Sequence, residues 1–234
     1  MQFVIKGLSK SFDKKNVLDD CSYAFETGKI YGLLGRNGAG KTTLFNCINQ
    51  DIECDGGEFY FQENDERIEV KTNDIGYVIS TPAVPEFLTA REFLRFFIDI
   101  NRESIRNLQP VDAYFDMVKI KEEDRGRLLK EFSHGMKNKM QMLVNFVAEP
   151  RLLLLDEPLT SLDVVVAEEM KGILRNMKGD RVTILSTHIL DLALDMCDEI
   201  VLLHKGKLEH IAIDMTDEED TRARIIAALS EEEV

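Results

Sequence analysis

The chain has 234 residues, 44% of them hydrophobic, so it can bury a sizeable core in one large domain or two small lobes. Its 43 acidic and 29 basic residues give a net charge of −14, which argues against a broad basic surface for nucleic acid. The chain has no apolar run near the roughly 18 residues that span a bilayer, and its start lacks the apolar core of a secretory signal. We therefore expect a cytoplasmic protein without a nucleic-acid partner.

The beginning of the chain predicts strands. Short strands are expected at VIKGLS, YAFE and KIYGLL, within residues 2–34, separated by turns at DKKN and TGK. The segment DGGEFYFQENDERIEV combines turn glycines with alternating aromatic residues, which is typical of a hairpin. A further strand is expected at IGYVIS, from residue 75.

The middle of the chain predicts helices. A T-x-x-E capping box at Thr89 and Glu92 opens the first helix, and TAREFLRFFIDI continues with helical spacing of its apolar residues. Pro110 opens a second helix, and a third is expected from about Met136 to Ala148. The apolar face predicted for the second helix consists of Val111, Tyr114, Phe115 and Val118.

After Pro150, nearly unbroken apolar runs alternate with helical stretches. The runs are RLLLLD, RVTILS and DEIVLLH, and helices are expected at about 164–177 and 189–197. This alternation indicates a parallel sheet covered on both faces, and hence an α/β fold. A second T-x-x-E, at Thr216 and Glu219, predicts a last, acidic helix. We expect one domain over residues 1–234, composed of an α/β lobe (1–81 and 149–213), a helical subdomain (82–148) and an acidic tail (214–234).

The segment LLGRNGAGKTTLF predicts a phosphate-binding loop. It satisfies the pattern GxxxxGK[ST] at Gly35, Gly40, Lys41 and Thr42, between an apolar strand and a helix. Glycines let backbone N–H groups converge on phosphate oxygens, and the free N–H groups of a helix start favour an anion. We expect Lys41 to place a positive charge near the β and γ phosphates and the Thr42 hydroxyl to bind Mg²⁺.

Two acidic residues and a histidine follow later apolar strands. Asp156 and Glu157 end the run RLLLLDE, at the carboxyl end of a strand, which is where ligands bind in open α/β sheets. Asp156 is expected to hold the metal through water, and Glu157 to orient or deprotonate the attacking water. His188 ends the next run, ILSTH, and is expected to contact the γ phosphate.

These motifs together resemble those of the nucleotide-binding subunits of ATP-binding cassette (ABC) transporters. The phosphate loop, FSHGM, LLLLDEP, SLD and the later histidine occur in the order and approximate spacing of that family, and the resemblance covers residues 2 to about 213. It implies a P-loop NTPase core of the RecA type with an antiparallel β subdomain, which binds ATP and Mg²⁺ and hydrolyses ATP. It also implies that Phe12 stacks on the adenine. The phosphate loop would complete the ATP site with Asn37, Gly38, Ala39 and Thr43.

The stretch EFSHGMKNKMQ is similar to the signature of the family, usually written LSGGQ. In that family two subunits enclose two nucleotides head to tail, and the signature of one contacts the γ phosphate bound on the other. The resemblance therefore implies an ATP-bound homodimer, or a dimer with a related cassette, in which Ser133 and Gly135 act on the nucleotide of the other copy. Asp163 would lie across the same interface. Lys137 and Lys139 either strengthen the positive field of this helix start or form a solvated basic face.

The chain departs from the family pattern at a few positions. Ser80 stands where the family has a glutamine that meets the metal, and this shorter side chain is expected to reach Mg²⁺ only through water. His134 replaces the first glycine of the signature, and Met136 replaces its glutamine. The form SxGMK is similar to that of cassette subunits that serve two-part exporters. Because the other motif residues are present, active hydrolysis is expected.

We expect an ATP-hydrolysing subunit that drives a separate membrane-spanning permease, an exporter by resemblance. That partner would hold it at the inner face of the cell membrane. The permease is expected to dock near residues 80–100, although most aromatic residues there are expected to be helix core. Two alternatives stay open. One is a cassette ATPase that acts in assembly, such as iron–sulfur cluster biogenesis, without transport; the other is a small-molecule kinase, which would leave the signature and SLD segments without a role.

Overall fold

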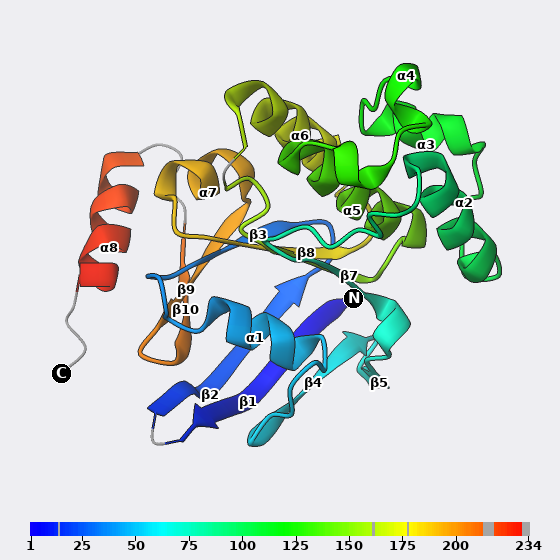
Figure 1. Ribbon diagram of the computed structural model, residues 1–234. Coiled ribbons are helices and arrows are strands. Elements are labelled where there is room, and N and C mark those ends of the chain that lie inside the picture. The colour runs from blue at the N-terminus through cyan, green and yellow to red at the C-terminus, as the bar shows by residue number, and fades with distance from the viewer. Residues whose placement is uncertain (14, 161, 177, 213–217, 231–234) are drawn as a thin grey trace.

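The computed structural model describes residues 1–13, 15–160, 162–176, 178–212 and 218–230. The strands of this part form two sheets, one of four strands and one of six. Figure 1 shows the smaller sheet below the larger one and most of the helices above it. The molecule is therefore layered, with the larger sheet in the middle.

The four-stranded sheet is antiparallel, in the order β2-β1-β4-β5. Its strands are β1 (Gln2–Phe12), β2 (Lys15–Glu26), β4 (Gly56–Glu63) and β5 (Glu66–Glu69). β4 and β5 pair as the hairpin that the sequence predicts. β1 and β2 are longer than predicted. Along β1, Phe3 and Ile5 are fully buried on one face, while Gln2 and Val4 on the other are only half-buried.

The six-stranded sheet has the order β10-β9-β3-β8-β7-β6. Its strands are β3 (Ile30–Leu34), β6 (Ile75–Val78), β7 (Leu152–Asp156), β8 (Val182–Thr187), β9 (Glu199–His204) and β10 (Lys207–Ile211). All neighbouring pairs except β9 and β10 are parallel, which confirms the predicted parallel sheet. β3, β7 and β8 are buried at every residue, as expected for strands covered on both faces. The antiparallel edge strand β10 was not predicted, because its sequence KLEHI is short and mostly polar.

Two large hydrophobic cores lie on opposite faces of this sheet. The first fills the space between the two sheets, where α1 (Lys41–Ile48) packs with Phe3, Phe25 and Phe61 of the antiparallel sheet. The second joins the other face to the helices, through residues such as Leu155, Leu185 and Met140. The helix that follows the phosphate loop is therefore held by both sheets.

Four helices lie between β6 and β7 and gather at one end of the molecule, in green in Figure 1. They are α2 (Ala90–Asn101), α3 (Val111–Met117), α4 (Glu122–Arg125) and α5 (His134–Ala148). Thr89 and Glu92 form the predicted capping box of α2, and α3 begins after Pro110 as predicted. The single turn α4 was not predicted. The limits proposed for a helical subdomain, residues 82 and 148, stay predictions.

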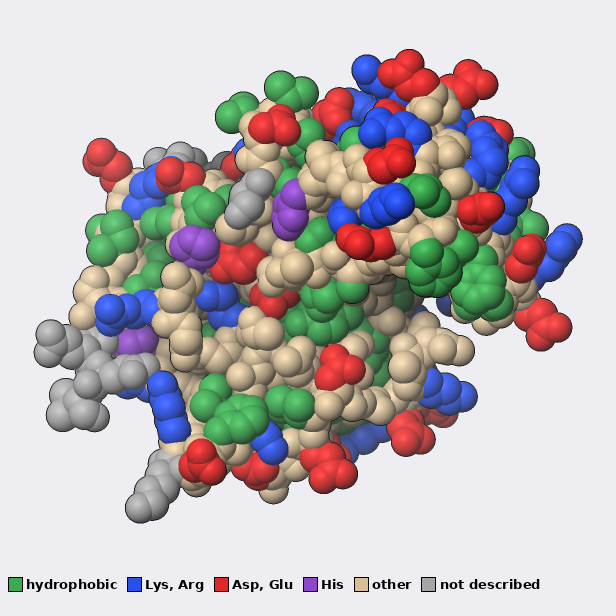
Figure 2. All heavy atoms as spheres, in the orientation of Figure 1, with side chains coloured by type: hydrophobic (Ala, Val, Ile, Leu, Met, Phe, Trp, Pro, Cys, Tyr) green, Lys and Arg blue, Asp and Glu red, His purple; other side chains and the backbone are tan. Residues whose placement is uncertain are grey.

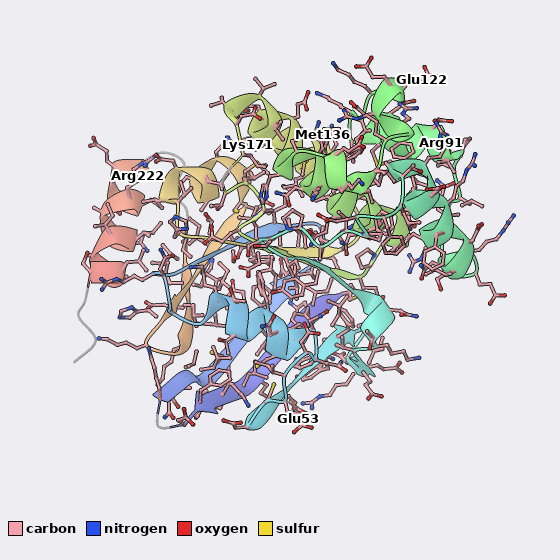
Figure 3. The ribbon with its side chains drawn as sticks, viewed as in Figure 1. Glu53, Arg91, Glu122, Met136, Lys171 and Arg222 are labelled. Carbon is pink, nitrogen blue, oxygen red and sulfur yellow. The ribbon has the colours of Figure 1, made fainter. Side chains whose placement is uncertain are left out.

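Charged residues bind these helices to one another. Arg91 of α2, labelled in Figure 3, donates two hydrogen bonds to Asp112 of α3, at 2.6 and 3.1 Å. Arg125 of α4 donates to the same carboxylate at 2.9 Å and bonds the backbone carbonyl of Ile120. These two arginines hold the pKa of Asp112 down at about 2. The helices α2, α3 and α4 are thus cross-braced by charged side chains.

Three more helices complete the described part of the chain. They are α6 (Val164–Asn176), α7 (Leu190–Met196) and α8 (Glu218–Ser230). Arg222 of α8 donates to Asp191 of α7, and Ile225 of α8 is fully buried. Thr216, the predicted cap of this last helix, lies outside the described residues. None of the helices in the described ranges has the length and apolar character needed to cross a membrane.

Candidate active site

The phosphate loop connects β3 to α1 in a conformation that depends on two of its glycines. Gly40 has a φ angle of 105°, and a Cβ on it would lie 2.8 Å from Cγ1 of Val17. A Cβ on Gly35 would lie 2.9 Å from the carbonyl oxygen of Leu203. At Gly40 both the backbone angle and the lack of space exclude a larger residue, and at Gly35 the lack of space does so. The middle of the loop, Asn37 and Gly38, is exposed, so backbone N–H groups there are accessible to a ligand.

The Lys41 side chain is folded back along this loop. Its Nζ donates to the carbonyl oxygen of Gly35 at 2.8 Å and lies 3.8 Å from Oε1 of Glu157. Only 6% of the residue is exposed, and this burial lowers the pKa of Lys41, while Glu157 and Asp156 act in the opposite direction. A poorly solvated ammonium group of this kind favours an incoming anion.

Asp156 at the end of β7 receives a hydrogen bond on each carboxylate oxygen. Thr42 Oγ1 donates to Oδ2 at 2.8 Å, and Ser186 Oγ of β8 donates to Oδ1 at 2.5 Å. Asp156 is 3% exposed. The structure thus joins Thr42 and Asp156, two of the three residues that the sequence predicts to face the metal, and it adds Ser186, which the sequence analysis missed.

The Glu157 carboxylate has a neighbour on each oxygen. Its Oε1 lies 2.9 Å from Nδ1 of His188, and its Oε2 accepts a hydrogen bond from Thr160 Oγ1 at 2.9 Å. Its backbone has a φ angle of 49°, in the left-handed region. A bulky residue in that region is uncommon and is held there by its surroundings. The predicted residues Glu157 and His188 are in direct contact, and Thr160 is a further neighbour that the sequence analysis did not single out.

The signature residues lie at the start of α5. Ser133 is the N-cap of this helix, and its Oγ accepts a hydrogen bond from the backbone N–H of Met136 at 3.3 Å. Gly135 is buried, and a Cβ on it would lie 3.0 Å from Cγ1 of Val166 of α6. Figure 3 shows Met136 on α5 beside α6, the helix that carries Lys171. The glycine therefore allows close packing of α5 and α6.

Both lysines that follow are paired within the chain. Lys137 donates to Glu86 at 2.6 Å, and Lys139 donates to Glu169 of α6 at 2.6 Å. Lys139 is 6% exposed. The interpretation of these lysines as a solvated basic face is therefore wrong for Lys139, because its ammonium group is buried against α6.

Three further predicted residues, Asp163, Phe12 and Ser80, are exposed, whereas Ala39 and Thr43 of the phosphate loop are half-buried. Asp163 accepts hydrogen bonds from the backbone N–H groups of Val165 and Val166, both at 3.0 Å, and so caps α6. Phe12 at the end of β1 is 47% exposed, with Lys10 Nζ 5.4 Å from the centre of its ring. Ser80 follows β6 and is exposed. The first residue of the SLD segment, residue 161, lies outside the described residues.

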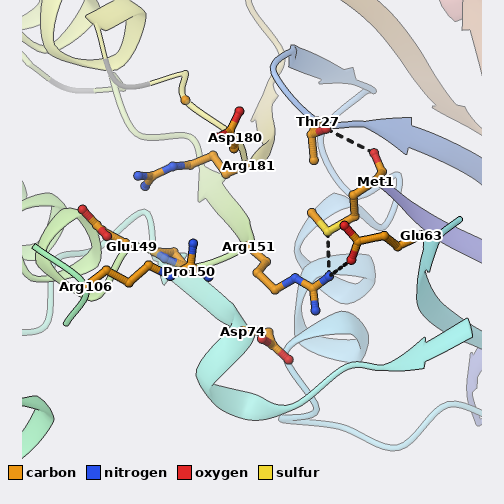
Figure 4. Close-up of a pocket in the computed structure, with 11 residues that line it drawn as sticks. Met1, Thr27, Glu63, Asp74, Arg106, Glu149, Pro150, Arg151, Asp180 and Arg181 are labelled. Atoms are coloured by element: carbon orange, nitrogen blue, oxygen red, sulfur yellow. Dashed lines mark hydrogen bonds and ion pairs between the residues drawn. The ribbon is translucent and has the colours of Figure 1, made fainter. Parts of the chain in front are cut away.

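A large cavity lies away from all of these residues. It has a volume of about 860 Å³ and lies where β7 and β8 begin, at the edge of the sheet opposite to Asp156 (Figure 4). Arg151 on its wall bonds Sδ of Met1 at 2.8 Å and lies 3.5 Å from Glu63. A smaller cavity, of about 400 Å³, borders the phosphate loop at residues 36–39. The size of a cavity therefore does not locate the candidate active site. The site is located by its predicted residues, which lie at the carboxyl ends of the parallel strands β3, β7 and β8.

Comparison with known proteins identifies the family. The model of the ABC transporter family matches residues 18–160. An uncharacterised ABC transporter ATP-binding protein of Methanocaldococcus jannaschii is 33% identical over 210 residues, which cover 88% of this chain and 75% of that protein. The sulfate/thiosulfate import ATP-binding protein CysA of Bordetella parapertussis is 30% identical over 221 residues. The matched region covers 90% of this chain and 62% of the length of CysA. The lantibiotic transport ATP-binding protein SrtF of Streptococcus pyogenes is 29% identical over 87% of each chain.

Solved structures give the same fold. The ATP-binding subunit of an ABC transporter superposes with a TM-score of 0.79 at 25% identity, over 99% of this chain and 100% of that one. A dimeric ATP-binding cassette in a post-hydrolysis state, bound to ADP and Pi, has a TM-score of 0.74 at 18% identity, over 88% of this chain and 96% of its own. The predicted P-loop NTPase fold is confirmed. The chain belongs to the ABC transporter family and is an ATP-hydrolysing, nucleotide-binding subunit of such a transporter.

Proposed function

We propose that the chain binds MgATP between its phosphate loop and the carboxylates of Asp156 and Glu157, as a head-to-tail dimer, and powers a separate membrane-spanning partner. The observation that carries this proposal is the convergence of Lys41, Thr42, Asp156 and Glu157 from a loop, a helix and a strand end. His188 joins this group through Glu157. Such a set offers cationic, hydroxyl and carboxylate groups to one triphosphate.

The donor set fits Mg²⁺. The Thr42 hydroxyl and the Asp156 carboxylate are oxygen ligands that already lie 2.8 Å apart, and Mg²⁺ prefers few protein oxygens together with phosphate and water. Within the described residues, no group of three or more His, Cys, Asp and Glu side chains could hold a metal by itself. This agrees with an ion that arrives with the nucleotide. When bound, Mg²⁺ supplies positive charge to the β and γ phosphate oxygens.

Each residue of the group then has a distinct role. Lys41 exchanges its bond with the loop carbonyl for bonds to phosphate oxygens, whose negative charge replaces the water that burial removes from the ammonium group. Glu157 orients the attacking water or accepts its proton. Thr160 and His188 hold the two oxygens of this carboxylate, so its direction is set before the water arrives.

A second copy completes the site in this proposal. Ser133 and Gly135 lie at the start of α5, where a helix end favours an anion. The hydrogen bonds of Asp156 and Glu157 in the described part of the chain go to other residues. The solved cassette with ADP and Pi is a dimer, which supports a dimeric state for this chain. In a head-to-tail dimer each signature would contact the nucleotide of the other copy.

A membrane partner docks, in this proposal, on the surface formed by Phe87, Phe96 and Ile100. These residues are 80%, 57% and 63% exposed. Phe93 and Phe97 pack against the core, so half of the aromatic residues of this segment are core residues, where most were expected to be. Figure 2 shows hydrophobic side chains grouped at the end of the molecule where α2 lies. Large exposed apolar side chains are typical of a protein interface. Export as the direction of transport is a proposal that rests on the SxGMK form alone, because the relatives include an import protein. Co-purification of the chain with membranes would exclude the alternative of a cassette ATPase that acts in assembly.

Glu157→Gln tests the core of the proposal. The amide cannot accept the proton of water, so hydrolysis should fall by roughly 10² to 10⁴, while ATP stays bound and holds two chains together. Light scattering should therefore show a dimer of Glu157→Gln with MgATP and a monomer without it. Steady-state hydrolysis by the unaltered chain is measured beside it.

The matched control is Glu103→Gln, an equivalent change at an exposed carboxylate outside this group of residues. It should hydrolyse ATP at the unaltered rate and show no trapped dimer. A Glu157→Gln protein that stays monomeric with MgATP, at concentrations where the unaltered chain turns over, contradicts the dimer. Retention of full hydrolysis by Glu157→Gln contradicts the role given to Glu157.

A further inference from the structure

Ser186 lies between the two acidic residues of the proposed site. It is on β8, directly opposite Asp156 in the parallel register of β7 and β8, and it is 0% exposed. Its Oγ is 2.5 Å from Oδ1 of Asp156 and 3.1 Å from the backbone N of Glu157. No other side chain in the described residues bonds both of these groups. One hydroxyl therefore joins the predicted metal residue to the backbone of the predicted catalytic residue.

The direction of both hydrogen bonds follows from the chemistry of the groups. The backbone N–H of Glu157 is a donor, so the Ser186 oxygen accepts that bond. The single hydroxyl proton then goes to the Asp156 carboxylate, which is an acceptor when ionised. Thr42 donates to the other oxygen of the same carboxylate at 2.8 Å. Asp156 is thus fixed in rotation by one donor on each oxygen.

The same serine holds an unusual backbone conformation in place. The N–H of Glu157 also points to the backbone carbonyl of Ser186, at 3.2 Å, so it is shared between two oxygens of one residue. Glu157 has a φ angle of 49°, which a residue with a Cβ adopts only when its surroundings hold it there. The left-handed turn aims the Glu157 side chain at His188 and Thr160 rather than along the strand.

Packing alone does not require a serine here. The two residues before it on β8, Ile184 and Leu185, are buried and apolar, as is usual in a strand covered on both faces. Thr187, which follows it, is also buried, and its hydroxyl accepts a bond from the backbone N–H of Ile189. A buried hydroxyl is unfavourable unless it is hydrogen-bonded. An alanine would fit the same space, so the hydroxyl is explained by the two bonds that it makes.

We propose that Ser186 is a positioning residue, which orients the Asp156 carboxylate toward the metal of MgATP and anchors the turn that aims Glu157. This inference rests on the proposed function, because it takes Asp156 as the residue that faces the metal. Ser186 itself does not contact the nucleotide. Its removal should therefore affect the gain in nucleotide binding that Mg²⁺ provides, and turnover, while leaving metal-free binding unchanged.

The test is Ser186→Ala, studied with trinitrophenyl-ATP as a fluorescent probe. Binding is titrated with Mg²⁺ and, separately, with EDTA, and hydrolysis of ATP is measured as kcat and KM. We expect the Mg²⁺-dependent gain in affinity and the value of kcat to fall by about 10- to 100-fold, as is typical when the partner of a metal ligand is removed. Affinity in EDTA and the KM for ATP measured at saturating Mg²⁺ should change by less than about threefold.

Thr183→Val is the matched control. Thr183 is a buried hydroxyl residue at the opposite end of the same strand, and its change to valine keeps shape while it removes the hydroxyl. It should leave the Mg²⁺-dependent gain unaltered. Ser186→Thr, which keeps the hydroxyl, should recover most of the loss seen in Ser186→Ala. A general loss of packing would not produce this pattern.

Several outcomes would overturn the inference. It is wrong if Ser186→Ala keeps the unaltered response to Mg²⁺ and the unaltered kcat, or if it weakens EDTA and Mg²⁺ binding equally. If Ser186→Ala does not fold, Ser186→Gly, which also removes the hydroxyl, takes its place; an unaltered Mg²⁺ response in that variant equally contradicts the inference. If the unaltered chain itself binds the probe equally with Mg²⁺ and EDTA, the proposed function fails, and the role of Ser186 fails with it.

Discussion

The phosphate side and the signature side of the molecule satisfy their polar groups in different ways. The phosphate side consists of Lys41, Thr42, Asp156 and Glu157, and the signature side consists of Ser133, Gly135 and Asp163. On the phosphate side, groups from a loop, a helix and two strands bond to one another. On the signature side, each polar side chain bonds, within the described part of the chain, only to the first turn of its own helix.

This difference shows which half of the proposed site is assembled within one chain. Lys41 and Asp156 are buried and held before any ligand arrives, which is the kind of preorganisation that costs little at the moment of reaction. Ser133 and Asp163 are exposed. The Ser133 hydroxyl accepts a bond from its helix and can still donate its proton outward. We infer that the signature side is offered to a second copy.

The largest expected effect comes from mixing two inactive variants. Lys41→Ala should lose hydrolysis through the phosphate side, and Ser133→Ala through the signature side, each by about 100-fold or more. If the two sides act across a dimer, an equal mixture contains mixed dimers with one intact composite site. Hydrolysis should then return to roughly a quarter of the unaltered rate when the two sites are independent. A mixture that shows only the sum of the two residual rates contradicts action in trans.

The cap at Ser133 needs its own control. Ser133→Ala also removes the N-cap of α5, which typically costs about 1 kcal/mol of stability. Ser133→Asp keeps a capping oxygen but puts negative charge where a phosphate would bind. It should therefore unfold at the temperature of the unaltered protein or above it, yet remain as inactive as Ser133→Ala. Recovery of activity in Ser133→Asp would show that only the cap matters.

The sequence predicts the residues of the phosphate side, but it does not predict the neighbouring residues that hold them in place. The loop, Asp156 and Glu157 follow from spacing, because this order of glycines, a lysine and acids at strand ends is typical of a site that binds phosphate and a metal. Ser186 and Thr160 could not be found in this way. Ser186 lies inside an apolar run that predicts a buried strand, and only the register of β7 and β8 brings it opposite Asp156. Contacts between distant strands are not encoded in local pattern.

Similar limits apply to the helices. The capping box at Thr89 and the apolar face of α3 follow from periodicity, and the structure confirms both. The burial of Lys139 could not be predicted, because its partner Glu169 is 30 residues away and is brought near by the packing of α5 on α6. The edge strand β10 was missed because an edge strand needs no apolar run. Most features that the sequence did not predict are therefore contacts between residues far apart in the chain, which form only when the elements pack together.

A second, smaller effect is expected at Asp163 on the signature side. Its carboxylate caps α6 through two backbone N–H groups. Asp163→Asn keeps the capping oxygen and removes the charge, so thermal unfolding should stay unchanged while hydrolysis falls by about tenfold, equivalent to about 1.4 kcal/mol. Asp163→Ala should add a loss of about 1 kcal/mol of stability. If Asp163→Asn hydrolyses ATP at the full rate and only Asp163→Ala loses stability, Asp163 acts only as the cap of α6 and has no role at the dimer interface.

The smallest effect concerns the bracing of α2, α3 and α4 by Asp112. Arg91 and Arg125 lower the pKa of Asp112 from 3.8 to about 2. Because the folded pKa lies below the usual value, the stabilisation is fully present above about pH 5 and is lost as the pH falls toward 2. Asp112→Asn should therefore lower the unfolding temperature slightly at pH 7, and the difference from the unaltered chain should shrink between about pH 4 and pH 2. A difference that is the same at neutral pH and at about pH 2 would exclude the ion pairs as its cause. Hydrolysis at neutral pH should stay close to unaltered, because Asp112 contacts neither the phosphate side nor the signature residues in the described structure.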